Sequence, residues 1–186
     1  MERKILALLA ASSLPLILAS STSAAAVKFT VGNFQTHQLA QVESETTLET
    51  FTGRTDKVTG AIQFDPKTRT GGRRIVVDAA SVHTGIDLRN QHLRGGQWLD
   101  TDKSPQIVFE TTKVQVVRGD TYRVTGKFTL RGVTKTLTAD AAVKHLKESD
   151  ATRRAGIKGD VLQIKTGLAV KPSDFGIKIS GPATGK

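Results

Sequence analysis

A regular alternation of polar and apolar residues over residues 122–143 constrains the fold of this 186-residue chain more than any other feature. In the run YRVTGKFTL, one phase holds Tyr122, Val124, Phe128 and Leu130, and the other holds only Arg, Thr and Lys. The alternation resumes after the turn-forming pair Arg131-Gly132. Residues two apart on a strand share a face, so the pattern predicts an antiparallel hairpin with one dry face and one wet face.

The same pattern recurs along the chain between turns rich in Gly, Asn, Asp and Pro. The other predicted strands are Lys28–Val31, Ala40–Thr47, Thr50–Thr55, Thr59–Phe64, Arg73–Val82, Gln106–Val117 and Asp160–Val170. The charged stretch Lys147–Arg154 has little pattern, and we expect it to form an exposed hairpin loop. Many short strands with almost no helix predict an all-β fold in one domain, either a closed barrel or a sandwich.

The alternation stops at residues 85–100, GIDLRNQHLRGGQWLD, where one short helix around residues 86–94 is predicted. The apolar side chains of this helix, which fall roughly on one side, are Ile86, Leu88 and Leu93. Two of the predicted strands, around Val76 and Val108, are apolar on both faces and need cover outside as well as inside. The helix is the candidate for that cover. This arrangement favours a barrel but leaves a sandwich open.

The first 26 residues have the organisation of a secretory signal peptide. Arg3 and Lys4 precede an apolar run that is too short for a comfortable membrane span, and Ala24–Ala26 provides small residues for cleavage. We expect residues 1–26 to be removed, which leaves a single domain over residues 27–186 in the periplasm or outside the cell. The chain contains no Cys, so neither a disulfide framework nor a lipoprotein anchor is expected.

The remaining domain is basic, with 25 Lys and Arg against 16 Asp and Glu and a net charge of +9. Such a surface favours anions, but its charges are scattered singly, so solubility and attraction to an anionic envelope surface are the simpler interpretation. Single-stranded nucleic acid requires exposed aromatic side chains for stacking. The nine aromatic residues lie mostly in the dry phase of strands, and no nucleic-acid partner is expected.

The residues do not indicate an enzyme. The sequence has no G-x-S-x-G element and no phosphate-binding G-x-x-x-x-G-K loop. Its four His residues lie in separate segments without a metal-ligand spacing, and only His83 and His92 are close enough in sequence to form a pair. We therefore expect no catalytic residues, no metal and no cofactor. The remaining interpretation is a binding protein with an apolar cavity.

We expect a barrel of about eight strands, which is just wide enough to be filled by side chains or to hold one small ligand. Gly60 and Gly126 lie in the dry phase of their strands. Their missing side chains would either leave room for a ligand or allow close packing of the strands, and the sequence leaves both interpretations open.

An ordered series of motifs resembles the YceI-like family. The motifs are TGAIQFDP, VDAASVHTGIDLRNQHLRGGQWLD, SPQIVFETTKV, YRVTGKFTLRGVTKTLTADAAV and SDFGI. They extend over essentially all of the predicted mature chain. The resemblance implies an antiparallel, lipocalin-like barrel, exported in bacteria, that holds a polyisoprenoid or similar long-chain amphiphilic lipid. The chain departs from the family's helix motif at Gly95-Gly96 and Trp98-Leu99, where the family has one small residue and two aromatic residues.

Strand phase and resemblance together give the candidate site. The candidate lumen residues are Val58, Ile62, Phe64, Ile75, Val77, Phe109, Tyr122, Val124, Phe128, Leu130, Leu137 and Ile164. Arg89, His92 and Arg94 keep their places in the helix motif, and they would either hold a phosphate or other headgroup near the barrel mouth or lock the fold. The bound molecule could be an isoprenoid or a quinone-like lipid, and a homodimer is left open. The alternative is a basic cell-envelope protein whose barrel is packed shut and whose surface binds an anionic partner.

Overall fold

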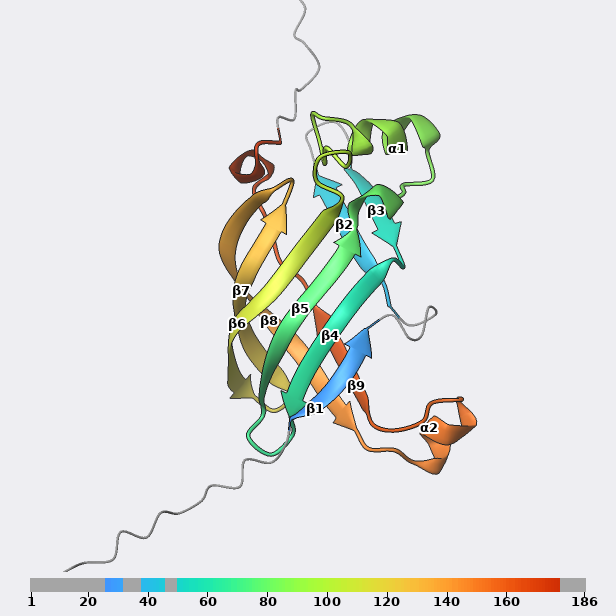
Figure 1. Cartoon of the computed structure of the whole chain (residues 1–186), viewed down its shortest axis with the longest axis vertical. Coiled ribbons are helices and arrows are strands. Elements are labelled where there is room, and N and C mark those ends of the chain that lie inside the picture. Colours follow the sequence, from blue (N-terminus) through green and yellow to red (C-terminus); the bar gives the residue numbers. More distant parts are fainter. Residues whose placement is uncertain (1–25, 32–37, 46–49, 178–186) are drawn as a thin grey trace, which may run out of the picture.

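The computed structural model of the chain describes residues 26–31, 38–45 and 50–177. Seven strands form one antiparallel sheet in the order β1-β4-β5-β6-β7-β8-β9, which curves into a nearly closed barrel (Figure 1). Their bounds are β1 Val27–Val31, β4 Val58–Asp65, β5 Thr70–Asp78, β6 Gln106–Arg118, β7 Thr121–Leu130, β8 Val133–Leu146 and β9 Val161–Thr166. The strands β2 (Ala40–Glu45) and β3 (Thr50–Thr55) form a separate hairpin. The predicted all-β, antiparallel barrel is confirmed, with seven strands where about eight were expected.

Within the described residues, four short helical segments lie at the two ends of the barrel. They are η1 (Ala79–Ser81), α1 (Asp87–Arg94), α2 (Asp150–Arg154) and η2 (Pro172–Phe175). Figure 1 shows α1, η2 and the β2–β3 hairpin at one end, here called the upper end, and α2 at the opposite, lower end.

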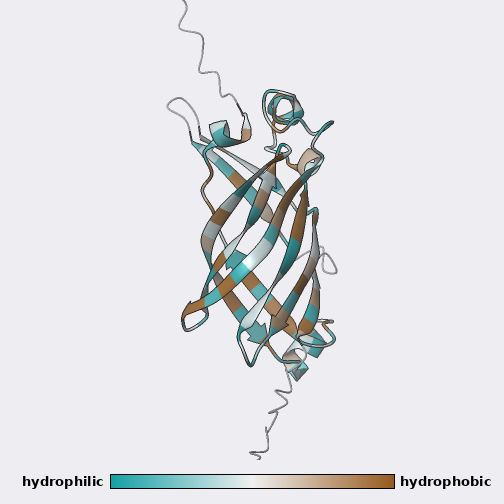
Figure 2. Cartoon of the chain, turned by 60° about the vertical axis from the view of Figure 1, so that its left-hand side comes forward, coloured by the Kyte–Doolittle hydropathy of each residue, from teal (hydrophilic) through white to brown (hydrophobic). Residues whose placement is uncertain are grey.

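The β7–β8 hairpin follows the predicted phases. Its register runs from Leu130 opposite Val133 to Thr121 opposite Ala142. Arg131 and Gly132 both have positive φ, +51° and +74°, as expected for the two-residue turns that match the twist of a hairpin. The outward phase is held by polar cross-strand pairs, which are Arg123 with Asp140, Thr125 with Thr138 and Thr129 with Thr134. Alternating hydrophilic and hydrophobic residues are visible along the barrel strands in Figure 2.

Three predicted segments differ from the structure. The strand expected over Arg73–Val82 ends at Asp78, because the Asp78 side chain accepts a hydrogen bond from the Ala80 backbone and starts η1. The last strand ends at Thr166 and does not continue to Val170. The expected loop at 147–154 contains α2, whose first turn is closed by reciprocal hydrogen bonds between Ser149 and Thr152. Residues 46 and 47 and the predicted signal peptide up to residue 25 lie outside the described residues.

The helix forms where it was predicted, but the prediction that it covers the outside of the barrel was wrong. It lies at the upper end (Figure 1), and its buried side chains are Asn90 and Leu93. Ile86 and Leu88 are 50% and 62% exposed. Asn90 accepts hydrogen bonds from the Thr84 backbone N–H at 2.7 Å and from the Thr84 hydroxyl at 2.9 Å. The hydrogen bonds of the buried Asn90 side chain therefore determine the orientation of α1. Hydrophobic periodicity alone does not predict such an orientation.

The two glycines of the dry phase allow close packing. A Cβ at Gly60 would lie 2.2 Å from the Arg74 carbonyl oxygen. A Cβ at Gly126 would lie 2.6 Å from both the Glu110 carbonyl oxygen and the Phe109 ring. The space that these glycines leave is thus occupied by neighbouring backbone and by the Phe109 ring.

Candidate functional site: the inner face of the barrel

Strand register identifies the side chains that face the interior. Tyr122 lies in one buried cluster with Phe64, Ala141 and Val143, so the phase of β7 that contains Tyr122 points inward. Paired residues of neighbouring strands share a face. Phe128 pairs with Phe109, Phe109 pairs with Ile75, and Ile75 pairs with Gly60. These residues of β7, β6, β5 and β4 therefore all belong to the inward-facing phase.

All twelve candidate lumen residues fall on this inner phase. Four of them are buried, namely Val58, Phe64, Tyr122 and Leu130. Partly exposed ones are Ile62, Ile75, Val77, Phe109, Val124, Phe128 and Leu137, and Ile164 is 42% exposed. The structure therefore brings the candidates to one surface, while their predicted role in ligand binding stays a prediction.

A packed cluster fills the lower end of the barrel. Phe64, Tyr122, Ala141 and Val143 are buried together, with Phe29 and Leu162 among the side chains packed against them. The Phe64 and Tyr122 rings meet edge to face at 6.1 Å. The Tyr122 hydroxyl accepts a hydrogen bond from Arg69 Nε at 3.0 Å, which satisfies the polar tip of this buried ring.

A second cluster fills the upper end. Leu130, Phe175 and Ile177 are buried there, and the Phe175 ring meets the Phe128 ring edge to face at 5.6 Å. Trp98 packs against the same cluster and contacts the ring of Phe51 on β3. Arg131 donates hydrogen bonds to the backbone carbonyls of Gly96 and Gly176, and so joins the segment after α1 to η2.

Between the two clusters and beside the lower one, the inner phase carries a band of apolar side chains that the protein does not fully cover. This middle band consists of Ile62, Ile75, Val77, Phe109, Leu137 and Ile164. All six are on the inner phase, and none is buried. These side chains therefore keep apolar accessible surface on the inner phase of the barrel. Such a surface has the chemistry to contact a hydrocarbon chain.

The three basic candidates of α1 lie at the upper end, and two of them make contacts within the fold. Arg94 Nε donates to the Ala80 carbonyl at 2.8 Å and joins α1 to η1. The Arg89 guanidinium lies 5.1 Å from the centroid of the Phe51 ring, a cation–π contact with β3. The side chain of His92 is exposed. These contacts support the structural role, and a headgroup role for the three residues stays a prediction.

Sequence reasoning missed several polar residues on the inner phase, among them Lys135 and His145 of β8. Lys135 lies opposite Phe128 and is exposed, which places a cation among the apolar residues of this phase. His145 lies on the same phase near the lower end, with Asp160 Oδ2 2.8 Å from its Nε2. The pKa of Asp160 lies below its usual value because the Glu148 backbone N–H and the His145 ring both hydrogen-bond to its carboxylate. The alternation itself could have revealed both, since each interrupts a run of apolar positions.

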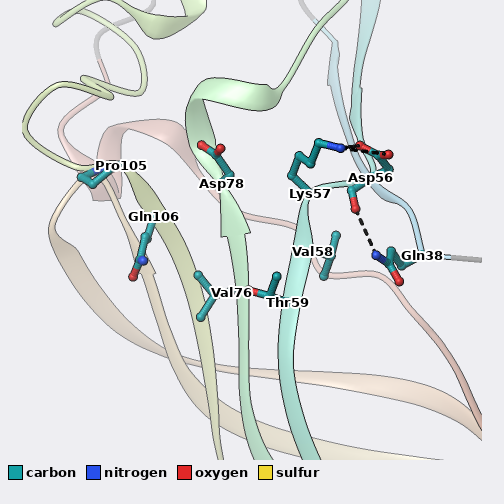
Figure 3. Close-up of a pocket in the computed structure, with 9 residues that line it drawn as sticks. All are labelled: Gln38, Asp56, Lys57, Val58, Thr59, Val76, Asp78, Pro105 and Gln106. Atoms are coloured by element: carbon teal, nitrogen blue, oxygen red, sulfur yellow. Dashed lines mark hydrogen bonds and ion pairs between the residues drawn. The ribbon is translucent and has the colours of Figure 1, made fainter. Parts of the chain in front are cut away.

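A separate hollow of about 470 Å³ lies outside the barrel wall. Figure 3 shows its lining, which includes Val76 and Thr59 from the outward phase and the Asp56–Lys57 ion pair at one side. Val58 is the one candidate lumen residue among its lining. Because its walls mix apolar, amide and charged groups without convergent polar contacts, this hollow does not specify a ligand.

The part of the chain that the structure describes contains no group of His, Cys, Asp or Glu side chains arranged to hold a metal ion. Within the same residues, no helix combines the length and the apolar character needed to cross a membrane.

Comparison of the sequence with known proteins identifies the family. The sequence matches the YceI-like domain over residues 20–186. The chain belongs to the YceI-like family. A UPF0312 protein of Pseudomonas aeruginosa is 35% identical over 137 residues, which are 71% of this chain and 66% of that protein. This YceI-like chain thus matches just under two thirds of the length of that relative.

Solved structures have the same barrel. BcnA of Burkholderia cenocepacia superposes with a TM-score of 0.62 at 24% identity, over 75% of this chain and 80% of that one. A polyisoprenoid-binding domain from Saccharophagus degradans superposes with a TM-score of 0.50 at 20% identity, over 75% of this chain and 76% of that one. At these identities, the likeness to the YceI-like chain concerns the fold.

Proposed function

We propose that this YceI-like protein is a non-enzymatic binding protein that holds a polyisoprenoid or similar long-chain amphiphile along the inner face of its barrel. The observation that carries the proposal is the middle band, an apolar inner surface left partly uncovered between two packed ends. The solved polyisoprenoid-binding domain with a similar barrel supports the same ligand class. A barrel packed shut would bury this band and would offer only its surface to a partner.

The apolar tail of such a ligand would dominate the affinity. Each buried CH₂ contributes about 0.8 kcal/mol, so a five-carbon isoprene unit contributes roughly 3–4 kcal/mol before the costs of ordering. A hydrogen bond to a charged headgroup contributes about 1.5–3 kcal/mol. Several isoprene units therefore outweigh one headgroup contact. In this proposal Arg89, His92 and Arg94 at the upper end influence the orientation of the ligand more than its retention.

The proposal includes export. A signal peptide over residues 1–26 would direct the domain to the periplasm or the exterior and then be removed. A long apolar chain there needs a protein to shield it from water. The ligand itself can be identified by mass spectrometry of an organic extract from protein purified from the envelope of its native host. A long-chain species near one molecule per protein is expected, and an empty extract would contradict the proposal.

Neighbouring residues on β5 provide a matched pair of variants. Ile75 is in the middle band, whereas Val76 points outward, and both are partly exposed. We expect Ile75→Asp to reduce retention of a long-chain lipid at least about tenfold, because a carboxylate would have to be desolvated against the tail. Val76→Asp should retain the lipid at the wild-type level. Retention is measured by extraction and by binding of a fluorescent isoprenoid, with circular dichroism to establish that both variants fold.

A further inference from the structure

We infer that the long-chain ligand enters and leaves the barrel sideways, between β1 and β9, and not through an end. The unpaired edges of these two strands are here called the seam. This inference rests on the proposed function, since it concerns the route of the same ligand. It assigns a part of the binding site that lies far from the α1 residues and from the upper end.

The topology explains why a seam exists. The sheet order begins with β1 and ends with β9, and every neighbouring pair between them is antiparallel. With seven strands that alternate in direction, the first and last run parallel. The antiparallel ladder cannot continue across them, and in the described part of the chain no β-pairing joins β1 to β9. The backbone groups along these two edges are therefore not tied to each other by a ladder.

The two ends of the barrel are poor routes for a bulky chain. The lower cluster and the upper cluster each contain packed aromatic rings, and the upper one is further held by Arg131. Opening either end would separate buried side chains such as Tyr122 and Phe175, which are 3% and 2% exposed. Above the level at which Phe29 and Leu162 pack against the lower cluster, parting two unpaired strand edges disrupts less packing.

The seam is closed by side-chain contacts near the lower end and is more exposed further along β9. Near the lower end, the Phe29 ring of β1 meets the His145 ring of β8 edge to face at 6.0 Å, which closes the barrel at that level. One inward position further along β9, Ile164 pairs with Val143 and is 42% exposed. Beyond Ala141, β9 no longer pairs with β8. The middle band is therefore reached from the seam above the Phe29–His145 contact.

Cross-linking tests this route, and the absence of Cys from the chain makes it selective. Thr30 and Gln163 are exposed, outward-phase residues on β1 and β9. The variant Thr30→Cys/Gln163→Cys is joined with a flexible, disulfide-containing bis-maleimide. In the matched control Lys144→Cys/Gln163→Cys, the same linker joins two residues that are already directly opposite on β8 and β9. The probe is dansyl-labelled farnesol, a neutral isoprenoid alcohol whose uptake and release are followed by fluorescence.

The seam-linked protein should take up the probe at least about tenfold more slowly than the unlinked variant, and it should retain probe when linked after loading. Reducing the linker should restore both rates, and the control link should leave them unchanged. Uptake by the seam-linked protein at the unlinked rate would overturn the lateral route while leaving the proposed function intact. Failure of the unlinked protein to bind the probe at all would contradict the proposed function, and the route with it.

Discussion

Gly60 shows how one residue fixes the distance between two barrel strands. Its φ is +142°, a conformation that side chains rarely adopt, and a Cβ there would overlap the Arg74 carbonyl oxygen. The glycine lies between inner residues of β4, so a larger side chain would push β5 outward at the level of Ile75. The close approach of β4 and β5 thus depends on the absence of a single Cβ.

We expect Gly60→Ala to destabilise the protein by about 1–3 kcal/mol, from backbone strain and the overlap with β5. Urea denaturation followed by circular dichroism measures the change. The control is Gly167→Ala, because a Cβ at Gly167 would meet no described atom within 4 Å and its φ is not positive. Equal stability of the two variants would show that β5 accommodates the extra methyl group without strain.

The turn between β4 and β5 illustrates how an element closes the lower end. The Asp65 side chain, in a residue only 5% exposed, accepts hydrogen bonds from the backbone N–H groups of Lys67 at 2.8 Å and Thr68 at 3.3 Å. This turn also presents Arg69, with φ of +57°, to the hydroxyl of Tyr122. The backbone N–H of Lys67 is the main cause that holds the pKa of Asp65 below its usual value.

The lowered pKa of Asp65 predicts a loss of stability in acid. A carboxyl whose pKa is depressed by folding contributes stability above its unfolded pKa, about 3.9, and loses that contribution as the pH falls through the folded value. We expect the melting temperature of the wild type to fall below pH 4, and Asp65→Asn to show a smaller fall. Thermal melts from pH 7 to pH 2 measure this, with Asp102→Asn, a change at an exposed residue of the segment after α1, as control. An acid profile of Asp65→Asn that parallels the wild type would exclude the turn as a contributor.

The whole molecule combines a basic surface with an apolar interior, and these two regions would bind partners of different chemistry. The net charge is +10 for the full chain, and the charged side chains of the barrel strands lie mainly on the outward phase. The α1 helix and the loop that follows it do not add to this net charge, because Arg89, Arg94 and Lys103 are balanced by Asp87, Asp100 and Asp102. An anionic surface would be attracted by these charges, whereas a neutral hydrocarbon would interact with the middle band alone.

Salt separates these two modes of binding. The Debye length shortens from about 10 Å at 0.1 M salt to about 3 Å at 1 M, so contacts between exposed charges weaken while hydrocarbon burial does not. We expect the affinity for a neutral isoprenoid alcohol to change less than about twofold over this range. Titration of the fluorescent alcohol at both salt concentrations measures it. A tenfold weakening in high salt would favour the alternative in which the basic surface is the binding site.

Much of the candidate site could be predicted from local sequence pattern, because alternation is a property of neighbouring residues. The phases of Tyr122–Leu130 and of the residues after Arg131-Gly132 determine which side chains share a face. They therefore placed Val124, Leu137 and the other lumen candidates on one surface. The helix at residues 87–94 could also be located, since the alternation stops there.

Tertiary structure alone decided what that surface encloses. The ends are filled by contacts between distant segments, such as Phe128 with Phe175 and Phe29 with His145. The position of α1 depends on the buried hydrogen bonds of Asn90, and the closeness of β4 to β5 on Gly60. Strand phase assigns a side chain to a face, but whether that face is filled, partly uncovered or reached through a seam depends on how far apart the strands finally lie.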